Sequence, residues 1–208
     1  MKAKDVAVWF LNKNPNLYYG FNDENTKLNK LVFFTNMMYY SVYGENLIDE
    51  PFKKWDNGPV CTDIYRAYRY GDLATSTTIK SDIKDKYAIE VLNIVNFVYS
   101  YLTGYELSQE SHKISIWNDA SHNDYLDFKR LKNEEIKKMK ILYDLNKDLD
   151  FENMGMEKIN DNIYYYDKNN IKIDDAIVEK LSCIQRMENR VVFLEMIDGE
   201  LVFNWWIL

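Results

Sequence analysis

The stretch that most constrains the fold of this chain runs from residue 26 to residue 72. Its first part is amphipathic, because apolar side chains recur every three or four residues, as they do on one face of a helix. The residues of this face are Leu28, Leu31, Val32, Thr35, Met38, Tyr39 and Val42. Asn25 or Thr26 can cap the start of the helix, and Gly44 can end it in a left-handed conformation. We therefore expect one long helix that buries this face in a core.

A corner of the chain follows this helix. Pro51 cannot continue a helix, and it pushes Glu50 toward an extended conformation. Gly58 permits a backbone geometry that other residues resist, and Pro59 fixes the next φ angle. A second, shorter helix should begin after the corner. Its expected cap is Thr62 or Asp63, and its expected end is Gly71.

Aromatic residues are concentrated around this corner. We expect Phe52, Trp55 and Tyr65 to pack in the core beneath the Gly-Pro pair. The sequence leaves open whether Tyr68 and Tyr70 are buried or exposed. An exposed tyrosine would be a candidate interface residue, because its rigid ring offers contact area at a low cost in entropy.

Two groups of residues, one in the stretch described above and one further along the chain, resemble the sequence pattern of a known family. The first group is Lys27, Leu28, Lys30, Leu31, Tyr39, Tyr40, Tyr43, Gly44, Glu50, Pro51, Phe52, Trp55, Gly58, Pro59, Val60, Tyr65, Tyr70 and Gly71. The second group is Leu107, Ser108, Ser111, His112 and Trp117. In this order and spacing they resemble the Panacea domain, a SocA-like antitoxin family that phages and prophages often carry. The resemblance covers about residues 1–142.

The second group departs from the family pattern more than the first. Ser111 stands where the family usually has Thr before His112, and Ile116 stands where it usually has Pro before Trp117. Thr62 also replaces a residue that tends to be Pro in the family. The resemblance is therefore closer in the first half of the matched region than in the second.

The resemblance implies a mostly α-helical domain over residues 1–150. The residue pattern of the remaining chain, described below, predicts a small α+β extension over residues 151–208. The resemblance also implies an antitoxin that binds a protein toxin directly, with no chemistry, cofactor or metal of its own. The residues of the family motif that we expect to be structural are Leu28, Leu31, Tyr39, Pro51, Phe52, Trp55, Gly58, Pro59, Val60, Tyr65, Gly71, Leu107, Ser108, His112 and Trp117. Candidate partner-binding residues, which we expect to be exposed, are Lys27, Lys30, Tyr40, Asp56, Asn57, Tyr68 and Tyr70.

Further helices are expected on both sides of the central stretch. Apolar spacing predicts a helix from Asp5 to Lys13 and another from Asp85 or Lys86 to Gly104. A short helix from Glu106 to Lys113 should follow, and then an irregular segment from Ser115 to Tyr125. A helix capped by Asn133 and running to about Asp148 completes the domain. Residues 74–85 read as a polar connector.

The last third of the chain has a different pattern. Asn162–Asp167 reads as a strand that turns back through residues 168–170 into a second strand at Ile171–Ile173. Asp174 can cap a helix. Asp198-Gly199 predicts a tight hairpin between residues 190–197 and 200–206, because both turn residues tolerate positive φ. We expect this extension to contribute partner specificity or self-association.

Composition narrows the choice of partner and compartment. The formal net charge is −7, which argues against direct nucleic-acid binding and suits a basic protein partner. The 17 tyrosines are compatible with an interface. The two cysteines, Cys61 and Cys183, match no zinc pattern and are expected to be free thiols in a reducing cytoplasm. No apolar run approaches the ~20 residues of a membrane span, so we expect a cytoplasmic protein without membrane contact.

Two other functions stay open at this point. The chain could be a phage- or prophage-encoded inhibitor of a host defence protein, and gene context would separate that function from an antitoxin. It could also be a hydrolase that uses His112 with His122, Glu110, Asp119 or Asp124. The spacing of the two histidines matches no zincin motif, and the chain has no G-x-S-x-G sequence. Binding without chemistry is therefore the favoured hypothesis.

Overall fold

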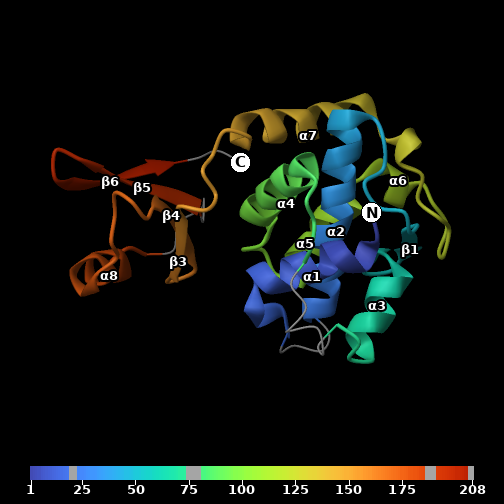
Figure 1. Ribbon diagram of the computed structural model, residues 1–208, viewed down its shortest axis with the longest axis horizontal. Helices are drawn as coiled ribbons and strands as arrows, with labels where there is room; N and C mark the ends of the chain where they lie inside the picture. Colours follow the sequence, from blue (N-terminus) through green and yellow to red (C-terminus); the bar gives the residue numbers. More distant parts are fainter. Residues whose placement is uncertain (19–22, 74–80, 186–190, 206–208) are drawn as a thin grey trace. The chain divides into compact units, whose positions relative to one another are not determined.

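The computed structural model describes residues 1–18, 23–73, 81–185 and 191–205. The chain divides into two compact units, Met1–Asp148 (unit 1) and Leu149–Leu208 (unit 2), close to the boundary expected near residue 150. Unit 1 is mostly helical, and unit 2 is a small α+β unit (Figure 1). Within the described residues, no helix has both the length and the apolar character that crossing a membrane requires.

Unit 1 is built around the long helix α2 (Asp23–Tyr43). The helices α1 (Ala3–Lys13), α4 (Lys86–Tyr99), α5 (Gly104–His112) and α7 (Asn133–Asn146) contact it on different sides (Figure 1). The core on the apolar face of α2 includes Leu28, Leu31, Phe33 and Phe52. The helix is less amphipathic than expected, because 14 of its 21 residues are buried and the buried set includes polar residues.

The buried polar residues of α2 bond to the chain that follows it. Asn29 Oδ1 accepts a hydrogen bond from Cys61 N (3.1 Å), and Asn36 Oδ1 accepts one from Ile48 N (3.0 Å). Because each side chain satisfies a buried backbone group, these residues fix the path of the corner segment. Gly44 ends α2 with φ +80°, as predicted.

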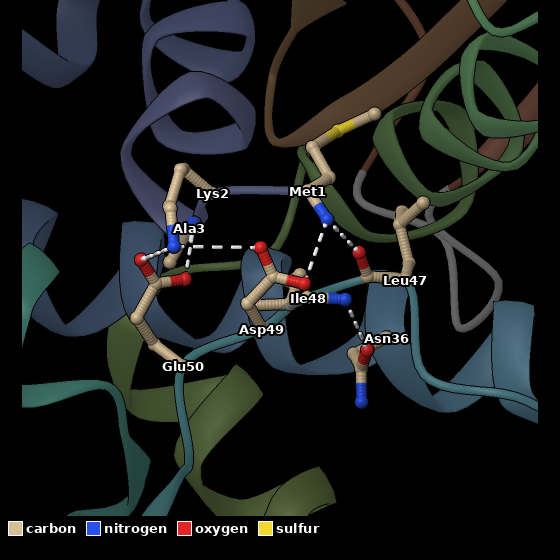
Figure 2. Close-up of polar contacts among 8 residues, drawn as sticks. All are labelled: Met1, Lys2, Ala3, Asn36, Leu47, Ile48, Asp49 and Glu50. Carbon is tan, nitrogen blue, oxygen red and sulfur yellow. Dashed lines mark hydrogen bonds and ion pairs between the residues drawn. The ribbon is translucent and has the colours of Figure 1, made fainter.

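The segment after α2 also holds the start of α1, as Figure 2 shows. Glu50 Oε2 accepts a hydrogen bond from Ala3 N (2.8 Å) in the first turn of α1, where a carboxylate is favourable. The Met1 amino group donates to Leu47 O (2.9 Å) and to Asp49 Oδ1 (3.1 Å). This hydrogen bond and the ammonium charge hold the pKa of Asp49 below its usual range. Glu50, which carries part of the family resemblance, therefore positions α1.

The corner contains a short hairpin that the sequence did not predict. Strands β1 (Lys53–Trp55) and β2 (Gly58–Val60) pair antiparallel, with Asp56 and Asn57 as the two turn residues. Three-residue strands are too short to show an alternating pattern. The helix α3 (Thr62–Arg69) follows, with Cys61 at its N-cap position and no side-chain cap. The expected cap by Thr62 or Asp63 is therefore wrong, whereas Gly71 has the expected positive φ (+85°).

Some helices after the corner begin or end at residues other than those expected. Asp85 caps α4 by accepting from Tyr87 N (2.9 Å), as predicted, but α4 ends at Tyr99. Gly104 begins α5 instead of ending α4, because Thr103 and Glu106 form a capping box there. The segment expected to be irregular contains α6 (Ser115–Asn118). Two 3₁₀ helices, η1 (Pro15–Tyr18) and η3 (Phe128–Arg130), complete the described part of unit 1.

Unit 2 is a four-stranded sheet with one helix. Its strands are β3 (Met154–Ile159), β4 (Asn162–Asp167), β5 (Val191–Ile197) and β6 (Glu200–Trp205), in the order β3-β4-β5-β6. β4 and β5 are parallel and the other pairs are antiparallel. The helix α8 (Asp175–Ser182) lies between β4 and β5 in the chain. The core consists of Tyr164, Ile171, Leu181, Val192 and Leu194.

Predictions for unit 2 are partly confirmed. Asp174 caps α8 by accepting from Ile177 N (2.9 Å), and Asp198-Gly199 forms the β5–β6 turn with φ +52° and +82°. The strand expected at Ile171–Ile173 is wrong, because β4 pairs with β3 through the turn at Asn160 and Asp161. The expected connector at residues 74–80 and the end of the last strand at Trp206 lie outside the described residues.

Candidate partner-binding site

Three side chains from three helices hold the β1–β2 hairpin by its carbonyl groups. Trp117 Nε1 of α6 donates to Trp55 O (3.1 Å), and Ser108 Oγ of α5 donates to Asn57 O (2.9 Å). Lys30 Nζ of α2 donates to Pro59 O (3.0 Å). The three acceptor carbonyls belong to every second residue of the hairpin: Trp55, Asn57 and Pro59. We call these three donors the clamp. The clamp fixes the turn of the hairpin against the helices.

Gly58 is required at the centre of the clamp. Its φ of +94° lies in the region that side chains disfavour. A Cβ atom built there would overlap Ser111 Oγ and would lie 2.6 Å from Lys30 Cε. Ser111 Oγ donates to Ser108 O (2.8 Å), so it is itself fixed. The prediction that Gly58 needs a positive φ is confirmed, and the close packing gives a second reason for glycine.

Lys30 lies in the core, and its expected exposure is wrong. Its side chain is fully buried beneath the hairpin, and its ammonium group is bonded to the Pro59 carbonyl. Burial lowers the pKa of Lys30 from 10.5 to about 7, because a charged ammonium is poorly solvated there. A buried side chain of this kind cannot contact a partner, so Lys30 is removed from the partner-binding candidates.

The other edge of the hairpin is also covered. Lys54 N donates to Asp124 O (2.9 Å), and Leu126 N donates to Phe52 O (2.9 Å), so residues 123–126 run beside β1. Lys54 Nζ donates to Ala120 O (2.8 Å) and lies 4.3 Å from the centre of the Trp117 ring. Both edges are therefore occupied, and the turn is the free end of the hairpin.

The two turn residues are the exposed part of this assembly. Asp56 and Asn57 are exposed, and Asp56 Oδ1 lies 3.0 Å from His122 Nδ1. We call Asp56 and Asn57 the hairpin tip. The tip is a polar surface on a backbone that the clamp holds rigidly, which is the arrangement that lowers the entropic cost of binding.

A shallow pocket of about 250 Å³ adjoins the tip. Its lining includes Asp23, Asn57, Tyr105 and Ser108. Sequence analysis missed Tyr105, whose side chain is 69% exposed. The capping box at Thr103-x-x-Glu106 is visible in the sequence and would have placed Tyr105 in the first turn of α5. The pocket and the tip together form a continuous candidate surface.

The remaining candidate residues lie elsewhere on unit 1. Tyr70 is 75% exposed, and it is the residue that follows α3. Tyr68 is half-buried and donates its hydroxyl proton to Leu17 O, and burial raises its pKa to about 12. Lys27 and Tyr40 are half-buried on α2. Among the predicted candidates, the structure thus brings only Asp56 and Asn57 together at the tip.

The aromatic residues of the corner are less buried than expected. Phe52 is in the core, as predicted. Trp55 and Tyr65 are half-buried, and their rings meet edge to face with centroids 4.9 Å apart. The expectation that all three belong to the core is therefore correct for Phe52 alone. Trp55 and Tyr65 cover the side of the hairpin next to α3.

The two histidines of the hydrolase hypothesis both lie near Asp56, but they have different side-chain partners. His112 stacks on Trp117 with centroids 3.9 Å apart, and its Nε2 lies 3.4 Å from Ser108 Oγ. His122 instead contacts the Asp56 carboxylate, and Glu110 pairs with Lys113 (2.6 Å). Burial, and then the charge of Lys30, lower the pKa of His112. Within the described residues, no three His, Cys, Asp or Glu side chains gather closely enough to hold a metal ion.

Comparison with known families identifies this region. Residues 28–118 match the family model described as antitoxin SocA-like, Panacea domain. The matched residues lie within unit 1. The match spans α2, the hairpin, α3, α4, α5 and α6, so it includes every residue of the clamp. No curated protein and no solved structure matches the chain.

Proposed function

We propose that this protein is an antitoxin that neutralises a protein toxin by direct binding through the hairpin tip and the adjoining pocket. The observation that supports this proposal is the set of hydrogen bonds made by the clamp. Trp117, Ser108 and Lys30, all within the matched residues 28–118, hold the hairpin and leave Asp56 and Asn57 exposed. A rigid, exposed turn is a suitable centre for an interface.

The charge of the surface favours a basic partner. The protein has a net charge of −7, and Asp56 and Asp23 both lie on the candidate surface. Tyr105 adds an exposed aromatic ring of the kind that often dominates binding energy. Toxins that act on nucleic acids carry basic surfaces, so this surface complements their charge.

The proposal requires no chemistry at the site. Ser108 Oγ donates its one proton to the Asn57 carbonyl (2.9 Å), so toward His112 Nε2 (3.4 Å) this hydroxyl can only accept. His112 is stacked on Trp117 and helps to fix the same segment. The protein would therefore act by occupying the surface of its partner, in a fixed stoichiometry.

The test is growth rescue by co-expression with the toxin candidate encoded by the neighbouring open reading frame. Asp56→Arg and Asn57→Arg should each abolish rescue, because loss of a central contact costs about 2 kcal/mol or more, a factor of about 30 in affinity. Glu45→Arg is the matched control. Glu45 is exposed and follows the C-terminal end of α2. This variant should rescue growth fully.

Thermal unfolding of each variant separates binding from folding. Both tip variants should melt within a few degrees of the wild type, because surface substitutions rarely change stability by more than ~0.5 kcal/mol. If folded tip variants still rescue growth, and removal of the chain after residue 148 abolishes rescue, the toxin is bound by unit 2 and the proposal is wrong.

A further inference from the structure

Unit 2 contains a cavity that belongs to none of the features described so far. Its volume is about 560 Å³, within the ~300–1,000 Å³ range of small-molecule sites. Every residue of its lining belongs to unit 2. The lining residues that matter here are Asp150, Met154, Tyr166, Asp167, Phe193 and Glu195.

The cavity lies at the carboxyl ends of two parallel strands, β4 and β5. The two strands pair in register from Ile163↔Val191 to Tyr166↔Leu194. One residue further, the same register places Asp167 beside Glu195. The carboxyl ends of parallel strands are the usual place for ligands in sheets of this kind, because the loops that follow the strands open there.

The two neighbouring carboxylates form an uncompensated pair. Like charges in adjacent positions on paired strands destabilise a sheet. Asp167 accepts hydrogen bonds from Asn169 N (2.8 Å) and Asn170 Nδ2 (2.7 Å), which fix its position without cancelling its charge. Within the described residues, Glu195 has no ion-pair partner. The lining contains no Lys or Arg.

A third carboxylate and two rings complete the lining. Asn153 Nδ2 donates to Asp150 Oδ2 (2.6 Å), and this bond lowers the pKa of Asp150, so the group is held ionised. The rings of Tyr166 and Phe193 are half-buried. The Tyr166 ring packs over Gly155 and against the core of unit 2, on the opposite face of the sheet from Phe193. Aromatic faces attract cations.

We propose that this cavity binds an organic cation, a guanidinium, amidinium or ammonium group carried on an apolar body. The carboxylates of Asp167 and Glu195 bind the charged group, and Phe193 and Met154 contact the apolar body. No three carboxylates of the described residues gather closely enough to hold a metal ion. This site is independent of the function proposed for unit 1.

The probe is benzamidinium, a planar cation on an aromatic ring, and benzamide is its neutral analogue. Each is titrated into the ¹⁵N-labelled full chain and followed by NMR. Benzamidinium should produce saturable shifts at Phe193 and Met154, with an affinity at least tenfold higher than that of benzamide. Equal shifts with both compounds, or no saturable shift at these residues, would overturn the proposal.

Glu195→Gln tests the carboxylate pair directly, because the Glu195 side chain is exposed and glutamine has the same size without the charge. The variant should bind benzamidinium at least tenfold more weakly and should melt at a higher temperature than the wild type, since the repulsion from Asp167 is removed. Glu179→Gln, an exposed carboxylate of α8, is the matched control and should change neither quantity. Unchanged binding by Glu195→Gln would refute the assignment.

A second titration, with two arginine compounds, shows whether the cation belongs to a protein segment or to a free small molecule. The tripeptide acetyl-Leu-Arg-Leu-amide is compared with acetyl-arginine-amide in the same titration. An affinity at least tenfold higher for the tripeptide assigns the site to an arginine in a protein segment. Equal affinities assign it to a free small cation. If neither compound binds, and benzamidinium also fails to bind, the cavity is not a cation site.

Discussion

The buried Lys30 makes the stability of unit 1 depend on pH in a direction that can be measured. Its pKa is about 7 in the folded protein and 10.5 for a solvated lysine, and burial is the cause. Between these values the unfolded chain binds one more proton than the folded chain. The free energy of unfolding must therefore rise with pH across this window. Below pH 7 both states are protonated, and this contribution no longer changes.

The size of the effect follows from the shift. A shift of one pKa unit corresponds to 1.36 kcal/mol, so the full difference is about 5 kcal/mol. Between pH 7 and pH 10 the wild type should gain about 3 to 4 kcal/mol of stability from this group alone. Lys30→Met keeps a long side chain in the core and removes the titration, but it leaves the Pro59 carbonyl without its donor, at a cost of about 1–3 kcal/mol.

Urea unfolding at pH 7, 8, 9 and 10, followed by helical circular dichroism, gives the free energy of unfolding for both proteins. Lys30→Met should be more stable than the wild type at pH 7, and this advantage should disappear by pH 10. Lys137→Met, which removes an exposed lysine of α7, controls for the loss of one positive charge. A stability difference between Lys30→Met and wild type that stays constant within ~1 kcal/mol over this range would show that Lys30 does not lose its proton in the fold.

Two further predictions concern the same assembly. Gly58→Val should lower the free energy of unfolding by several kcal/mol, because a β-branched residue is strained at φ +94° and its Cβ overlaps Ser111 and Lys30; a melting temperature equal to that of the wild type would contradict this reasoning. His112→Ala should lower the melting temperature through the lost Trp117 stacking and should retain rescue of growth. Because burial lowers the folded pKa of His112, the wild type loses stability as pH falls through ~6.5, and this loss should be smaller in His112→Ala.

Elements with a strong local signal could be predicted from the sequence. Asp85 and Asp174 cap the helices that they were expected to cap, because an aspartate side chain can accept from the first free N–H groups of a helix without help from distant residues. Asp198-Gly199 forms the expected turn for a similar reason. In each of these cases the information lies within four residues of the element.

Elements that depend on distant partners could not be predicted. Lys30 reads as a surface residue at helical spacing, and only the hairpin placed over it explains why it is buried. The strand β3 has a weak apolar pattern and exists because β4 pairs with it. The residues around Ile171 are apolar in a pattern typical of a strand, but no strand forms there. The Ile171 side chain instead packs in the core of unit 2, in the same cluster as Leu181.

The clamp residues, which carry part of the family resemblance, and the exposed residues of the hairpin tip are different sets, and their environments explain why. Trp117, Ser108 and Gly58 are constrained by bonds and close packing inside unit 1, so any protein that uses this hairpin needs similar residues at these positions. Asp56 and Tyr105 are exposed, and no packing constraint fixes their identity. A motif of this kind therefore identifies the scaffold, and under the proposed function the choice of partner would lie in the exposed side chains of the tip and the pocket. Transplanting the exposed residues alone onto a Panacea domain of another protein should consequently transfer the choice of partner without loss of stability.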